Sequence, residues 1–341
     1  MITPNRVGAQ PTDPRSPSGR WQQLWREAVT DPLELLRLLG LENQAERLLP
    51  VRDTGFATRV PRGYIARMRP GDPADPLLLQ VLPVAAELLE SPGFVTDAVG
   101  DMAARSAHGV LQKYQGRALL IATGSCAVNC RFCFRRHFPY ADETAAANRW
   151  QAAIAAVVAD AGVSEVILSG GDPLSLSTPK LTELTDGLAA APHVRRLRIH
   201  TRLPVVLPER VDAALQGWLG SLSQQKVLVL HVNHPNELDG ATAEACRRLR
   251  EAGVTLLNQS VLLRGVNDAA DVLSELSERL LEQGVLPYYL HQLDRVQGVA
   301  HFEVDDERAL ALVETLRERL PGYLVPRLVR EIPGEASKSP V

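Results

Sequence analysis

Three cysteines lie close together near the middle of the chain. Cys126, Cys130 and Cys133 form a Cys-x3-Cys-x2-Cys segment, and the fourth cysteine, Cys246, is distant in the sequence. Thiolates are soft ligands that suit iron–sulfur clusters and zinc. A closed structural zinc site needs four ligands, whereas three cysteines in one loop can hold three corners of a 4Fe-4S cube and leave the fourth iron open. Cys246 is interpreted as a small buried residue on a helix, with a role as fourth ligand as the alternative.

Short apolar, β-branched runs alternate with amphipathic stretches from about residue 116 onward. This alternation predicts six strand–helix units and a parallel sheet that forms a partial barrel of class α/β. Active sites of such barrels lie at the carboxyl ends of the strands, which is where the polar side chains fall. The predicted strands cover residues 118–123, 165–169, 196–201, 226–232, 254–263 and 285–291, and the polar residues at their ends include Cys126, Gly170, Gly171, Asp172, His200, Arg202, His231, His234, Asp268 and His291.

Composition limits the remaining choices. The chain has 341 residues and a formal charge of −3, which gives no electrostatic footprint for nucleic acid or an anionic membrane. No apolar run is long enough to span a bilayer, and the beginning of the chain lacks the apolar stretch of a signal peptide, so a cytoplasmic protein is expected. We expect a flexible leader over residues 1–20, a helical region over 21–104, the barrel over 105–304, and a C-terminal helix with a tail over 305–341.

The cysteine segment resembles the signature of radical S-adenosylmethionine (SAM) enzymes, Cys-x3-Cys-x-aromatic-Cys, with Phe132 as the aromatic residue. The resemblance implies a partial (β/α)6 barrel of TIM type and a 4Fe-4S cluster whose open iron binds SAM. It also implies that Gly170, Gly171 and Asp172 match the family's SAM-binding motif, with Phe132 near SAM. Glycine in that motif is expected because it permits close approach of the backbone to a ligand.

The wider pattern is similar to the lysine 2,3-aminomutase family of radical SAM enzymes. It includes the residues CAVNCRFCFRR from Cys126, NQSVLLRGVND ending at Asp268, and a Pro-Gly…Lys-x-Pro tail around Lys338. The resemblance implies that Lys338 carries pyridoxal 5′-phosphate (PLP) through an imine, which is the usual role of a PLP lysine. Arg117 matches a family arginine near the PLP phosphate.

Substrate residues follow from the same resemblance. Arg135, two positions after the third cysteine, would bind the carboxylate of L-lysine, to which the planar fork of arginine is well suited. Asp268 and Glu331 would hold the far ammonium group, with Glu331 standing where the mutases have Asp. The alternatives are a solvated basic loop for Arg135 and surface carboxylates for the two acids. His231-x2-His234 is interpreted as a hydrogen-bonding pair, with a metal site as the alternative.

Further runs resemble the branch of the family that makes (R)-β-lysine for elongation factor P. These runs are CRFCFRRHFPY ending at Tyr140, YYLH from Tyr288 and VQGVAHF from Val296. The implied partners are elongation factor P, its β-lysine ligase, and an electron donor such as flavodoxin or ferredoxin. Two other functions stay open: a radical SAM and PLP aminomutase for another amino acid such as glutamate, and a non-catalytic metal-stabilised binding protein.

Overall fold

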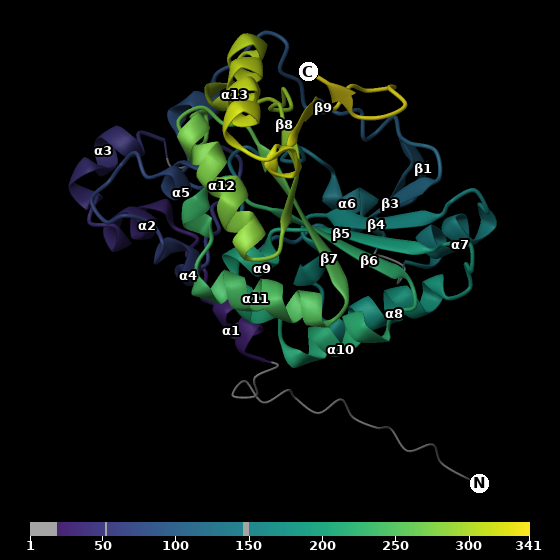
Figure 1. The fold of residues 1–341 in the computed structure, drawn as a ribbon. Coiled ribbons are helices and arrows are strands. Elements are labelled where there is room, and N and C mark those ends of the chain that lie inside the picture. The colour runs from purple at the N-terminus through teal and green to yellow at the C-terminus, as the bar shows by residue number, and fades with distance from the viewer. Residues whose placement is uncertain (1–18, 52, 146–149) are drawn as a thin grey trace.

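A computed structural model describes residues 19–51, 53–145 and 150–341. One sheet organises this part of the chain, with its strands in the order β1-β2-β3-β4-β5-β6-β7-β8-β9-β10. Every pairing from β3 to β9 is parallel. Each of the strands from β3 to β8 is followed by a helix, so the predicted partial (β/α)6 barrel is confirmed (Figure 1). The strands are β1 (Arg105–Ala107), β2 (Val110–Leu111), β3 (Arg117–Thr123), β4 (Glu165–Gly170), β5 (Arg196–Thr201), β6 (Gln225–His231), β7 (Val254–Val261), β8 (Leu286–His291), β9 (Arg327–Arg330) and β10 (Ser339–Pro340).

Helices cover the outer face of the sheet, and the C-terminal tail lies on the side of the sheet away from most of these helices (Figure 1). Parallel strands covered in this way are apolar on both faces, as in the middle of β4, where Val166, Ile167 and Leu168 are all buried. Three of the barrel helices, α10, α11 and α13, begin at an aspartate cap; Asp239, for example, accepts a hydrogen bond from the Thr242 amide at the start of α11. The helices of the barrel are α6 (Tyr140–Glu143), α7 (Gln151–Ala159), α8 (Thr178–Leu188), α9 (Leu203–Val206), α10 (Ala213–Ser221), α11 (Gly240–Glu251), α12 (Ala270–Glu282) and α13 (Asp306–Arg319).

The N-terminal region packs beside the barrel as short helices. Pro32 begins the second of them, a position at which proline is accepted because the amides of a first helical turn have no partner within the helix. The predicted leader lies almost entirely outside the described residues. The helices here are α1 (Arg20–Arg26), α2 (Pro32–Leu38), α3 (Ala45–Leu48), α4 (Arg62–Ile65) and α5 (Pro76–Leu79). In the described ranges, none of the helices combines the length and the apolar character needed to cross a bilayer.

The C-terminal tail differs from the predicted separate segment, because it extends the sheet. β9 pairs in parallel with β8, and β10 folds back antiparallel onto β9. Gly334, at φ +84°, provides the left-handed residue in the turn between them. Ser339 lies opposite Arg330 in this hairpin, so the preceding Lys338 comes next to Glu331. The sequence-based boundary at residue 304 therefore separates two parts of one sheet.

Candidate active site

One cavity of about 510 Å³ lies at the carboxyl ends of the strands. This volume is typical of a site for cofactors and small molecules. The cavity is lined by all three clustered cysteines, by Lys338, and by every other residue that the sequence and the resemblance assigned to the site except Asp268 and His234. In total, the lining contains seven lysine or arginine side chains and four carboxylates, and this excess of positive charge suits anionic ligands.

The three thiols belong to the loop that follows β3, and all three line the cavity. Burial raises the pKa of all three, that of Cys133 to about 11, and a bound cation would oppose this by stabilising the thiolates. Within the described residues, no three His, Cys, Asp or Glu side chains converge as ligands of a single metal ion would. A 4Fe-4S cluster does not require such convergence, since each cysteine binds a different iron. The donor set therefore fits a cluster.

The glycine-rich turn after β4 is shaped by the cysteine loop. A Cβ on Gly170 would lie 2.5 Å from the Thr123 carbonyl oxygen, and one on Gly171 would lie 2.5 Å from that of Ser125. The close approach that requires glycine is thus to the chain's own backbone. The carboxylate of Asp172 accepts four hydrogen bonds, from the Thr201 hydroxyl and three backbone amides. Asp172 accordingly joins the ends of β4 and β5. The backbone of the turn is bonded as well, because the Gly171 amide donates to the Thr123 carbonyl at 2.7 Å and the Gly170 carbonyl accepts from the Tyr140 hydroxyl at 2.8 Å.

The cavity also contains three imidazoles, each of which has one ring nitrogen without a partner in the described part of the chain. His200, His231 and His291 line it, and the buried Nε2 of each has no hydrogen-bond partner among the described residues. Burial lowers the pKa of all three, that of His231 to about 3, so they are neutral at physiological pH. Buried polar atoms without partners are uncommon in proteins and point to a bound ligand. His234 instead accepts a hydrogen bond from the Asn236 amide outside this cavity, and Cys246 is buried in the core on α11.

Arg135 is buried and held by two partners. Its Nε donates to Asp101 at 2.6 Å, and its Nη1 donates to the Ser169 hydroxyl at 3.0 Å. No hydrogen bond of its Nη2 to a described residue is formed, so this nitrogen can still donate to a carboxylate in the cavity. Arg135 is therefore a fixed cationic group, not part of a solvated loop.

Lys338 is paired with Glu331 across the β9–β10 hairpin, with Nζ 2.6 Å from Oε2. Glu331 also accepts a hydrogen bond from the Tyr114 hydroxyl at 2.7 Å and lies 3.5 Å from the ammonium of Lys113. These contacts tie the tail to the segment between β2 and β3, at the opposite edge of the sheet. Burial alone would raise the pKa of Glu331, but the charge and hydrogen bond of Lys338, together with the contacts of Tyr114 and Lys113, outweigh it and bring the pKa below its ordinary value.

Asp268 requires a correction. It lies in the loop before α12, where its carboxylate accepts a hydrogen bond from the Gly265 amide, and it does not line the cavity. The second acid beside Glu331 is Asp294, which follows β8 and lines the cavity. Burial raises the pKa of Asp294 to about 7, with the charge of Lys338 opposing that rise. The carboxylate of Asp294 has no hydrogen-bond partner among the described residues and is free to bind a cation.

Three arginines gather at another part of the lining. Arg117, Arg198 and Arg327 all line the cavity, and Arg198 is fixed by two hydrogen bonds to the buried Glu165, at 3.1 and 2.6 Å. The ring of Tyr289 lies 5.9 Å from the ammonium of Lys338. Clustered guanidinium groups are well suited to phosphate, so the lining fits a phosphorylated aromatic cofactor that reaches Lys338.

Sequence reasoning missed several residues of the site. Asp294 follows β8, whose end faces the cavity. The segment after each predicted strand is where such residues are expected, so this one was predictable from the sequence. Arg327 lies on β9, a strand that no alternating pattern indicated. Asp101 precedes β1 and Lys113 lies between β2 and β3, and no sequence signal connects them with Arg135.

Comparison with known proteins agrees with the fold. The family model of the Radical SAM superfamily matches residues 120–276. An L-lysine 2,3-aminomutase of Escherichia coli is 50% identical over 94% of this chain and 94% of its own length. One from Haemophilus influenzae is 45% identical over 96% and 98% of the two chains, and one from Clostridium subterminale is 35% identical over 94% of this chain and 77% of its own. By these matches the chain belongs to the lysine 2,3-aminomutase family of radical SAM enzymes, which are isomerases.

Proposed function

We propose that the chain is an L-lysine 2,3-aminomutase that converts (S)-α-lysine into (R)-β-lysine by a radical shift of the amino group from Cα to Cβ. The observation that carries the proposal is the shared cavity: three thiols suited to a 4Fe-4S cluster and a lysine suited to PLP line the same space as Arg135, Asp294 and Glu331. Family membership supports an enzyme over a non-catalytic metal-stabilised binding protein. The two acids disfavour glutamate as the substrate, because its second carboxylate would meet like charge.

The residues divide between the cofactors and the substrate. Cys126, Cys130 and Cys133 would hold the cluster, with SAM against the backbone of Gly170 and Gly171. Lys338 would carry PLP, with Arg117, Arg198 and Arg327 available to its phosphate. When bound, the cluster with SAM supplies a carbon radical that takes and returns a hydrogen atom, and PLP supplies a carbonyl that condenses with amines and a ring that delocalises an unpaired electron.

The chain's own part is to fix lysine at both ends. Arg135 binds the carboxylate through its remaining donors, and Asp294 with Glu331 binds the far ammonium. Fixing both ends orients the Cβ–H bond and removes the entropy cost of finding that orientation. Apolar residues of the lining, including Leu119, Ile167 and Leu293, exclude water and other hydrogen donors from the reacting carbon.

The resemblance to the branch that serves elongation factor P suggests the use of the product. We propose that β-lysine is passed to a separate ligase, which attaches it to the factor in the cytoplasm. A small electron-transfer protein such as flavodoxin or ferredoxin would reduce the cluster. The relatives from Escherichia coli and Haemophilus influenzae, which match this chain over nearly their whole lengths, are both named L-lysine 2,3-aminomutase and support lysine as the substrate.

The proposal is tested by product analysis. Anaerobically reconstituted protein is incubated with lysine, SAM, PLP and a chemical reductant, and the amino acids are separated by chiral chromatography. We expect (R)-β-lysine from the unmodified protein, none from Lys338→Ala or Cys130→Ala, and no β-glutamate when glutamate replaces lysine. Absence of β-lysine from protein that contains its full iron and PLP would refute the proposal.

A further inference from the structure

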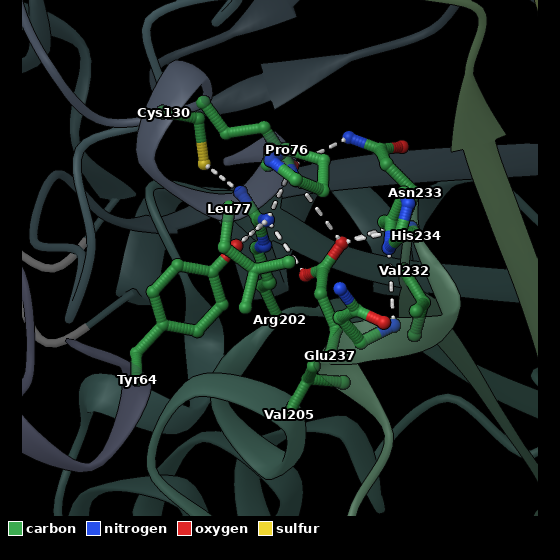
Figure 2. Close-up of polar contacts among 12 residues, drawn as sticks. Tyr64, Pro76, Leu77, Cys130, Arg202, Val205, Val232, Asn233, His234 and Glu237 are labelled. Carbon is green, nitrogen blue, oxygen red and sulfur yellow. Dashed lines mark hydrogen bonds and ion pairs between the residues drawn. The ribbon is translucent and has the colours of Figure 1, made fainter. Parts of the chain in front are cut away.

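The guanidinium of Arg202 meets one of the three clustered cysteines. Arg202 follows β5, and its Nη1 donates to the Cys130 sulfur at 2.7 Å (Figure 2). Neither Cys126 nor Cys133 has such a partner within the described residues. The contact brings a full positive charge to a single sulfur, inside a region where few water molecules can screen it.

The position of Arg202 is fixed from several sides. Its backbone amide donates to Asp172 at 2.8 Å, and its Nη2 donates to Glu237 and Gln80 at 2.7 Å each. The side chain also lies over the rings of Phe132 and Tyr64, 5.5 Å from each centroid. The Nη1–sulfur contact is thus the result of a rigid arrangement of the surrounding groups.

The neighbours of Arg202 are themselves buried. Gln80, Glu237 and the ring of Tyr64 are fully buried, and Arg202 is 5% exposed. A buried arginine and its paired glutamate are costly to desolvate, and replacing them by apolar residues would serve stability at least as well. Arg202 of this ion pair contacts Cys130, which indicates a function connected with that cysteine.

We propose that Arg202 is a positioning residue that raises the reduction potential of the cluster through its charged hydrogen bond to Cys130. This inference rests on the proposed function only in requiring a cluster on the three cysteines. One electron taken from an external reductant makes the cluster more negative by one charge, and no bond of the protein breaks. A nearby fixed positive charge stabilises the reduced form more than the oxidised form, and hydrogen bonds to cluster sulfurs act in the same direction.

Glu237 provides a prediction of the opposite sign. Its carboxylate offsets part of the charge of Arg202, so Glu237→Gln removes a negative charge near the cluster while the amide keeps an oxygen acceptor for the Asn233 and His234 amides. We expect the potential to fall in Arg202→Gln, to rise in Glu237→Gln, and to lie between the unmodified and Gln values in Arg202→Lys. If Arg202 and Glu237 had only structural roles, Arg202→Gln and Glu237→Gln would shift the reduction potential in the same direction or leave it unchanged.

The experiment is a redox titration of reconstituted full-length protein without SAM, followed by the electron paramagnetic resonance signal of the reduced cluster. We expect Arg202→Gln to shift the reduction equilibrium at least tenfold, which is about 59 mV for one electron. Arg196→Gln is the matched control, because Arg196 begins the same strand and bonds to Ser164 without touching the cysteines. Its potential should equal that of the unmodified protein.

The outcomes separate the two proposals. Unmodified protein that takes up no iron would overturn the proposed function and this inference together. Equal potentials in Arg202→Gln, Arg202→Lys and the unmodified protein, each with its full iron, would overturn this inference alone, as would a fall in Glu237→Gln. If Arg202→Gln does not retain iron, the potentials of Arg202→Lys and Glu237→Gln decide the matter.

Discussion

Glu87 joins the N-terminal region to the cysteine loop, and its replacement gives a sharp test of how that loop is held. Its fully buried carboxylate accepts hydrogen bonds from the Nε of Arg131 at 2.8 Å and from Arg136 at 2.7 Å, and Arg131 adds a second contact through its Nη2. Both arginines belong to the loop that contains Cys130 and Cys133. Burial would raise the pKa of Glu87, but the two arginines outweigh it and lower the pKa below its ordinary 4.5.

Glu87→Gln removes the charge and leaves two buried guanidinium groups without a counterion. Breaking a buried ion pair from one side costs about 3–5 kcal/mol, and we expect a loss of this size in anaerobic urea unfolding, together with weaker retention of iron. Because the folded pKa of Glu87 is lowered, its stabilisation is present above about pH 4.5 and is lost as the pH falls through the folded value.

Glu303→Gln is the control for Glu87→Gln, because Glu303 pairs with the largely exposed Arg295 at 2.7 Å. Exposed pairs contribute up to about 1 kcal/mol, so the control should unfold close to the unmodified protein and retain its iron. An unfolding midpoint and iron content of Glu87→Gln equal to those of Glu303→Gln would refute the reasoning.

Three further predictions concern the cavity and its turn. Asp294→Asn should raise KM for lysine at least tenfold while Asp268→Asn leaves it unchanged, and equal KM values in steady-state assays would contradict the correction. Because the pKa of Asp294 is raised to about 7, it gains its charge above that pH; lysine affinity by calorimetry should rise between pH 6 and pH 8, and Asp294→Asn should flatten the rise. Gly171→Ala should reduce iron retention, because its Cβ would lie 2.5 Å from the Ser125 carbonyl oxygen. Gly322→Ala is the control, since a Cβ there meets open space, and it should retain as much iron as the unmodified protein. Equal iron contents in the two variants would count against the proposed role of the turn.

The sequence predicts the barrel well because its signals are local. The strand over Arg196–Thr201 has the predicted bounds, and β3, β4, β6, β7 and β8 differ from expectation by at most two residues at either end. Each combines a β-branched or apolar run with a following turn, which a short window can detect. Strands β2 and β10 have only two residues each, and such short elements are set by tertiary pairing that no window reveals.

The site was predictable where a residue is tied to a motif by spacing. Cys126, Cys130, Cys133 and Lys338 line one cavity, although more than 200 residues separate the cysteines from the lysine along the chain. Asp268 was wrongly placed because its loop follows a strand, yet its carboxylate turns back to the Gly265 amide. Asp294 was missed because the prediction stopped at His291, three residues too early. Networks such as Arg202–Glu237–Gln80 join distant segments through side chains, and a single sequence does not encode that proximity visibly.

The most direct test of the shared cavity is to locate PLP in protein that also contains its cluster. Reconstituted protein is treated with borohydride, which fixes PLP to the lysine that carries it, and is then digested for peptide mass spectrometry. The chain has four lysines, and of these Lys113 and Lys338 line the cavity, with Lys113 already paired to Asp101 at 2.7 Å. We predict about four irons per chain and PLP on Lys338 alone. PLP on Lys113 or on a lysine outside the cavity, in protein with its full iron, would contradict the account.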